Sequence, residues 1–210
     1  MRVIAIDGPA GSGKSTVAKA LAARLNLDYL DTGAMYRAVA FAAIQKQIRP
    51  NEVEEITKVA ESLDLELTEE SCVVNGVDAT IEIRGPEVTS LVSQVATMAE
   101  VRTEMVKRQR AWAETRNGGV MEGRDIGSVV FPDAMLKIYL TASEEVRAAR
   151  RAAEVKEGDV AVVAADIERR DAVDTQRAAS PLVEAEDAIV VDTSEMTLQQ
   201  VVDHVIGLIP

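Results

Sequence analysis

Residues 8 to 16 of the chain have the types and spacing of a phosphate-binding loop. They read GPAGSGKST and complete the pattern G-x-x-x-x-G-K-[ST]. Glycines let the backbone curl so that its N–H groups point at a bound anion, and a helix that follows adds its positive end. The predicted contacts to the phosphates of ATP are Gly8, Pro9, Ala10, Gly11, Ser12, Gly13, Lys14, Ser15 and Thr16.

Two side chains of this loop are expected to do more than bind. Lys14 should bridge the β- and γ-phosphates and take part in catalysis, and the Ser15 hydroxyl should ligate Mg²⁺, the implied cofactor. The motif leaves the destination of the phosphoryl group open, because GTPases and motor ATPases that use water share it.

Clustered arginines favour transfer to a small acceptor, because a transferase must neutralise the phosphates of two substrates. The chain lacks an Asp-x-x-Gly after a second strand and an Asn-Lys-x-Asp motif that would read guanine. An NTP hydrolase or switch is therefore the alternative, together with kinases of UMP, AMP or shikimate. The clustered arginines are Arg37, Arg102, Arg124, Arg147, Arg150, Arg151, Arg170 and Arg177.

Two of these clusters have helical spacing. Arg147, Arg150 and Arg151 fall at i, i+3 and i+4, so they share one helix face with no acid among them. Arg170, Asp174 and Arg177 also share a face, but an ordinary i,i+4 salt bridge explains that spacing equally well.

The elements that must position these residues alternate between strand and helix. An apolar run at 3–6 leads into the loop, and helical spacing follows over 16–25. Further strands are predicted at 120–121, 137–140 and 188–191, with a last helix over about 197–209. This alternation predicts an α/β fold with a mainly parallel sheet.

One segment has a different pattern. Residues 63–83 alternate apolar and polar side chains, with Asn75-Gly76 at a hairpin turn, which predicts a small antiparallel insertion.

Composition limits the class of protein. The 210 residues carry a net charge of −12, which disfavours nucleic-acid and anionic membrane partners. Only 3% are aromatic, so platforms for base stacking are scarce and the core must be aliphatic. A single Cys72 and no long apolar stretch predict a cytoplasmic protein, and the length predicts one domain.

Six ordered blocks of the sequence resemble the bacterial cytidylate kinases over nearly the whole length. They are IDGPAGSGKST, DTGAMYRAVA, SQVA followed by VR and RQRA, EGRDIGSVVFPDA, KIYLTAS and RRDAVDTQRAASPL. The resemblance implies an ATP-dependent kinase that phosphorylates CMP or dCMP. We expect the protein to act as a monomer.

The resemblance also implies a fold: a P-loop NTPase three-layer α/β sandwich with a mainly parallel five-stranded sheet. Residues 1–210 would form one nucleoside monophosphate kinase domain with its core at 1–31, 118–145 and 178–210. The NMP-binding region would be 32–117, with the antiparallel insert at about 63–85, and a short lid would span about 146–177.

Roles for single residues follow from the same resemblance. Arg37 and Arg124 would hold the CMP phosphate. Cytosine would be contacted by Ser93, Arg102 and Asp125, and the sugar by Arg170 and Asp174. Arg177 would lie near the transferring phosphates, and Thr32 and Tyr36 would line the pocket. The lid would contribute Arg147, Arg150 and Arg151. An acceptor group that faces the amine of cytosine would face a carbonyl in uracil, so discrimination is chemically reasonable. The catalytic set would be Lys14, Arg124, Arg177, Arg147 and Arg151.

Simpler explanations stay open for several of these residues. Thr32 could instead be the N-cap of the helix that follows it, and Tyr36 could be a packing residue. Arg124 and Asp125 could form an adjacent surface ion pair. Glu122 is either a carboxylate directed toward the metal or an acid at a strand end.

Overall fold

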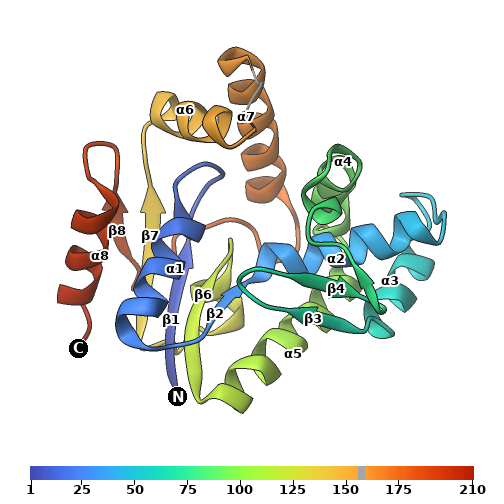
Figure 1. Cartoon of the computed structure of the whole chain (residues 1–210), viewed down its shortest axis with the longest axis horizontal. Coiled ribbons are helices and arrows are strands. Elements are labelled where there is room, and N and C mark those ends of the chain that lie inside the picture. Colours follow the sequence, from blue (N-terminus) through green and yellow to red (C-terminus); the bar gives the residue numbers. More distant parts are fainter. Residues whose placement is uncertain (156–158) are drawn as a thin grey trace. The chain divides into compact units, whose positions relative to one another are not determined.

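The computed structural model describes residues 1–155 and 159–210 (Figure 1). The chain divides into two compact units, which are treated separately below. Unit 1 comprises Met1–Tyr29 and Ala113–Pro210, and unit 2 is the continuous segment Leu30–Trp112.

A five-stranded sheet forms the centre of unit 1. The strands are β1 (Arg2–Asp7), β2 (Tyr29–Asp31, where the chain leaves the unit), β6 (Gly118–Glu122), β7 (Leu136–Thr141) and β8 (Ile189–Asp192), in the order β2-β6-β1-β7-β8. β1 pairs in parallel with both β6 and β7, and β7 pairs in parallel with β8. The predicted parallel sheet is confirmed, and β1, which carries the phosphate loop at its end, lies in the middle.

Within the described residues, four α-helices lie wholly in unit 1. They are α1 (Lys14–Leu25), α6 (Glu144–Val155), α7 (Val160–Gln176) and α8 (Leu198–Gly207), with a π-helical turn at Ile126–Val130. Apolar side chains of α1 and α8 pack with those of β1, β6, β7 and β8 in one aliphatic core. α8 begins at a capping box, in which Thr197 and Gln200 satisfy each other's backbone N–H groups.

Unit 2 combines helices with the predicted antiparallel insertion. Its helices are α2 (Thr32–Gln45), α3 (Val53–Glu61), α4 (Pro86–Val95) and α5 (Ala99–Arg116, which continues into unit 1), with a 3-10 helix at Glu82–Arg84. Strands β3 (Leu65–Leu67), β4 (Cys72–Val74) and β5 (Val77–Asp78) form a second sheet with antiparallel neighbours. Asn75 and Gly76 join β4 to β5 with φ of 51° and 78°, as a type I′ hairpin turn requires.

The division of residues 1–210 into core, NMP-binding region and lid stays a prediction. The predicted lid of residues 146–177 includes residues 156–158, which lie outside the described part. Among the described helices, none combines the length and the apolar character that crossing a membrane requires.

Candidate active site

The phosphate loop joins β1 to α1 through glycines that no other residue could replace without strain. Gly8 has a φ of 148°, and a Cβ there would lie 2.1 Å from the carbonyl oxygen of Leu140 on β7. Gly11 has a φ of 75°, and a Cβ there would lie 2.7 Å from the carbonyl oxygen of Arg147 on α6. The loop therefore packs directly against two neighbouring elements, and this requires glycine at both positions.

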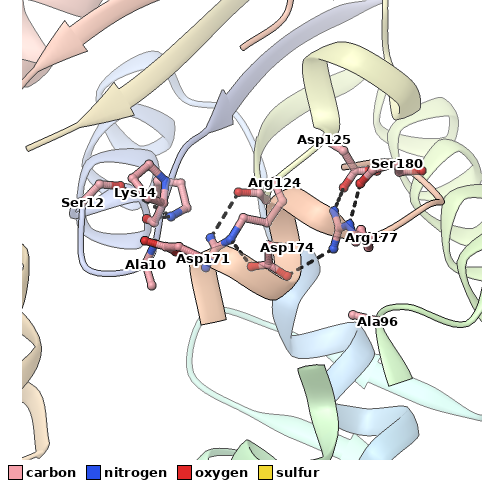
Figure 2. Close-up of polar contacts among 12 residues, drawn as sticks. Ala10, Ser12, Lys14, Ala96, Arg124, Asp125, Asp171, Asp174, Arg177 and Ser180 are labelled. Atoms are coloured by element: carbon pink, nitrogen blue, oxygen red, sulfur yellow. Dashed lines mark hydrogen bonds and ion pairs between the residues drawn. The ribbon is translucent and has the colours of Figure 1, made fainter. Parts of the chain in front are cut away.

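Lys14 is a buried cation at the first position of α1. Its Nζ donates to the carbonyl of Pro9 at 2.6 Å and approaches Ser12 Oγ at 3.5 Å (Figure 2). Burial, followed by repulsion from Arg124, lowers the pKa of Lys14 from 10.5 to about 7. The loop thus holds a desolvated amine that an anion would help to charge.

Arginines and carboxylates form a network in unit 1. Arg124 Nε donates to Asp174 Oδ2 at 2.8 Å, and Arg177 donates to the carboxylates of Asp174 and Asp125 at 3.4 Å each (Figure 2). Arg177 Nε also donates to the carbonyl of Ser180 at 2.5 Å. Burial opposes the charge of Arg124, but Asp174 outweighs it, and the pKa of Arg124 is raised. These contacts hold both guanidinium groups in place.

Two of the simpler explanations are wrong in this network. Arg124 and Asp125 are not an isolated surface pair: Arg124 pairs with Asp174, and the 6% exposed Asp125 with Arg177. Asp174 is likewise not confined to a local pair within its helix, because its shortest ion pair reaches Arg124 after β6.

The arginines of α6 contact the phosphate loop. Arg147 donates to the carbonyl of Ala10 at 3.0 Å, and Arg150 donates to the carbonyl of Ser12 at 3.2 Å. Asp171 of α7 pairs with Arg147 at 2.5 Å and accepts the N–H of Ala10 at 2.9 Å. No acid lies among these arginines on their own helix face, and the acid that balances Arg147 comes from a different helix.

Arg170 of α7 interacts electrostatically with two other predicted arginines, Arg124 and Arg151. Burial and repulsion from Arg124 and Arg151 lower the pKa of Arg170, while Asp166 and Asp174 oppose that fall. Arg170 of α7 is therefore repelled by positive charges both on α6 and after β6, and a bound anion would relieve this repulsion.

Unit 2 brings together its own predicted residues. The guanidinium of Arg102 lies 5.3 Å from the ring centre of Tyr36 and donates to the carbonyl of Ala96 at 3.1 Å. Both side chains are buried. Arg37 donates to the carbonyl of Ile83 and to Thr89 Oγ1 at 3.1 and 2.9 Å. Packing against Arg102 is thus one observed role of Tyr36.

Thr32 is not the cap of α2. Asp31 precedes the helix, and its side chain accepts the N–H of Ala34 at 2.9 Å, while Thr32 is the first helical residue and is buried. Asp and Thr both cap helices well, so residue type alone does not distinguish Asp31 from Thr32. Ser93 is half-buried within α4.

Three buried or half-buried residues beside the loop were not predicted. Asp7 accepts two backbone N–H groups after β6, Asp171 braces Arg147, and Thr193 accepts from Arg150 at 2.8 Å. Asp7 could have been found as an acid that ends an apolar strand directly before Gly8. Asp171 and Thr193 have no local signal, because their partners are distant in sequence.

Glu122 ends β6 as a buried carboxylate that accepts from the hydroxyl of Tyr29. One observed partner of Glu122 is therefore a tyrosine.

The residues of the loop suit a Mg²⁺ ion that arrives with a nucleotide. Ser15 is exposed in the first turn of α1, where its hydroxyl offers a hard oxygen donor. Within residues 1–155 and 159–210, no group of three or more His, Cys, Asp or Glu side chains is arranged to hold a metal. An ion here would take most of its ligands from phosphates and water, as Mg²⁺ usually does.

Comparisons with known proteins agree with this geometry. A family model described as cytidylate kinase matches residues 4–210. The cytidylate kinase of Corynebacterium efficiens is 48% identical over 214 residues, covering 98% of this chain and 93% of that protein. That of Desulforamulus reducens is 49% identical over 212 residues, covering 98% and 95%. Among solved structures, a gluconokinase from Sinorhizobium meliloti covers 98% of this chain and 90% of its own, with a TM-score of 0.52 and 14% identity, and so is similar in fold.

Proposed function

The chain belongs to the cytidylate kinase family, and on that basis we propose that it transfers the γ-phosphoryl group of ATP to CMP or dCMP. The products are CDP or dCDP and ADP. The observation that carries this proposal is the concentration of buried Lys14, half-buried Arg124 and buried Arg177 in one unit, each held by named contacts. A hydrolase that activates water has less need of a second set of phosphate-binding arginines.

The donor side of the reaction is assigned to the loop. Residues 8–16 bind the phosphates of ATP through backbone N–H groups and Lys14, and Ser15 is the protein ligand of Mg²⁺. Phosphates restore the charge of Lys14, because an anion next to a desolvated amine raises its pKa. Arg147 and Arg151 of α6 complete the catalytic set near these phosphates.

The acceptor residues of unit 1 are Arg124, Asp125, Arg170, Asp174 and Arg177. Arg124 binds the phosphate of CMP, and its ion pair with Asp174 supports this role by keeping the guanidinium charged and oriented. Asp125 accepts from the exocyclic amine of cytosine, Arg170 and Asp174 contact the sugar, and Arg177 lies near the transferring group.

The acceptor residues of unit 2 are Thr32, Tyr36, Arg37, Ser93 and Arg102. Arg102 donates to the O2/N3 edge of cytosine. Its buried guanidinium, held beside the ring of Tyr36 and bonded to the carbonyl of Ala96, supports this role, because a donor oriented before binding loses little freedom when a ligand arrives. Ser93 accepts from the amine, and Arg37 contacts the phosphate.

The reaction needs no strong general base. The phosphate of CMP already carries an anionic oxygen at neutral pH, and this oxygen attacks the γ-phosphorus in line with the leaving ADP oxygen. Lys14, Arg124 and Arg177 balance the charge that spreads over the transferring group. Bound Mg²⁺ supplies neutralisation of the β- and γ-phosphate oxygens.

Three broader properties are part of the same proposal. The protein acts as a monomer in the cytoplasm, with no nucleic-acid or membrane partner. The net charge of −12 supports the absence of anionic partners. Buried Cys72, whose pKa is raised to about 11 by burial, suits a reducing compartment in which it stays a thiol.

The proposal is tested by measuring ADP release in a coupled assay with Mg·ATP and one acceptor at a time: CMP, dCMP, UMP, AMP or shikimate. We expect strong turnover with CMP or dCMP and very little ATP hydrolysis without an acceptor. Turnover with AMP or shikimate and none with CMP would refute the acceptor, and equal ADP release with no acceptor would favour the hydrolase.

A further inference from the structure

A single carboxylate joins the end of β1 to the segment that follows β6. Asp7 is the last residue of β1, directly before Gly8, and is 6% exposed. Its Oδ1 accepts the N–H of Ile126 at 2.8 Å, and its Oδ2 accepts the N–H of Gly127 at 2.7 Å. Each carboxylate oxygen thus satisfies one backbone donor at the start of the π-helical turn.

Burying the charged carboxylate of Asp7 costs free energy. Burial is the main reason that the pKa of Asp7 is raised to about 6, although both N–H groups act in the opposite direction. An apolar side chain would avoid burying a charge, but it would leave two N–H groups of a buried turn without an acceptor. The carboxylate therefore determines the conformation of the turn.

The turn begins immediately after the two residues that the proposed function uses on the acceptor. Arg124 and Asp125 precede Ile126, and they meet Asp174 and Arg177 in ion pairs. Resting on that proposed function, we propose that Asp7 is a positioning residue for the acceptor: its two hydrogen bonds set the backbone from which Arg124 and Asp125 reach CMP.

The position of Asp7 gives this role a geometric benefit. The same residue borders the phosphate loop on one side and holds the acceptor segment on the other, so both segments are fixed to the end of β1. A rotation of either one by a few degrees would change the distance between the donor and acceptor phosphates, to which in-line transfer is sensitive.

Gly127 provides a second way to disturb the contact. A Cβ there would lie 3.4 Å from Asp7 Oδ2 and 3.2 Å from the side-chain carbons of Lys137. Alanine at this position would keep the carboxylate, touch its Oδ2 and crowd the side chain of Lys137, so that either Lys137 or the turn must shift by a few tenths of an ångström. Two variants that differ in chemistry thus address one contact.

The test compares Asp7→Asn with Asp203→Asn in the full chain. Asp203 is an exposed acid of the same unit that pairs with Arg24 at 3.2 Å, so it controls for the change of charge. The amide that replaces the carboxylate of Asp7 would face one of the two N–H groups with its own donor, and we expect the KM for CMP to rise about tenfold or more. The Kd for ATP should change less than threefold, and D203N should match the wild type in both constants.

A merely structural role predicts a different result. It would lower the melting temperature and weaken the binding of ATP and CMP together. A parallel rise in the KM for CMP and the Kd for ATP in D7N therefore overturns the proposal. If D7N does not fold, Gly127→Ala decides: a KM for CMP at least threefold higher with ATP binding unchanged supports positioning, and an unchanged KM overturns it.

A failure of the Asp7 proposal can be distinguished from a failure of the proposed function. Wild-type turnover with CMP tests the function, and the ratio of the two constants in the variants tests Asp7. If the wild type prefers another nucleoside monophosphate, the proposed acceptor fails, and the same ratio measured with that acceptor still decides the role of Asp7.

Discussion

Replacing Lys14 by methionine should stabilise the nucleotide-free protein while abolishing transfer. Lys14 is 7% exposed, and its pKa falls from 10.5 to about 7. One pKa unit corresponds to about 1.4 kcal/mol, so charging this amine costs on the order of 4 to 5 kcal/mol. Removing the amine would recover this free energy, but the loss of its hydrogen bonds to Pro9 and Ser12 would offset about 2 to 3 kcal/mol of the gain.

The net gain is therefore about 2 kcal/mol. For a protein of this size that is a rise in melting temperature of roughly 4 to 8 °C at pH 7. The pH dependence has a definite sign. The unfolded chain binds more protons than the folded one between about pH 7 and 10.5, so the wild type should gain stability as pH rises through that window. The variant should lack this gain.

The measurement is thermal unfolding with and without Mg·ATP, together with the transfer rate. Lys137→Met is the matched control, because Lys137 is also a buried lysine but has a carboxylate partner, Asp187, at 2.7 Å. K137M should gain no stability and should keep its response to ATP. The reasoning fails if K14M melts lower than the wild type without nucleotide, or if both lysine variants change in the same way.

Three further predictions concern other parts of the molecule. Gly76→Ala should lower the free energy of unfolding by about 1 kcal/mol in urea titrations and leave activity unchanged, because only its φ of 78° opposes a side chain. Arg102→Leu should raise the KM for CMP by about 10- to 100-fold and leave the Kd for ATP unaltered. An equal rise in both constants would indicate misfolding instead. Tyr29→Phe should cost about 1 to 3 kcal/mol of stability in urea, because buried Glu122 loses this donor; an unchanged midpoint would show that this hydrogen bond contributes nothing.

The sequence predicted those parts of the fold whose cause is local. The strand, loop and helix around Lys14 follow from apolar runs and the glycine spacing, and the turn at Asn75-Gly76 follows from the need for positive φ at two positions. The start of α2 could not be placed to the residue, because Asp31 and Thr32 are both good caps.

The pairing of charges could not be predicted. Arg124 and Asp125 are neighbours in sequence, yet each finds its partner on or next to α7, about fifty residues further along. Asp171 could not be matched to Arg147 for the same reason: only the packing of α6 against α7 brings them together. Helical spacing identifies residues that share a face of one helix, but it cannot identify partners on a second helix.

The central position of β1 has a consequence for the order in which the protein forms. Its register pairs Arg2 with Gly118 and Ile4 with Leu136, so both neighbours of this strand are synthesised more than one hundred residues later. Leu30–Trp112 is continuous and can begin to fold on the ribosome while β1 waits unpaired. We therefore expect slow folding, limited by closing this long loop, and a phosphate-binding activity that emerges only when nearly the whole chain has been made.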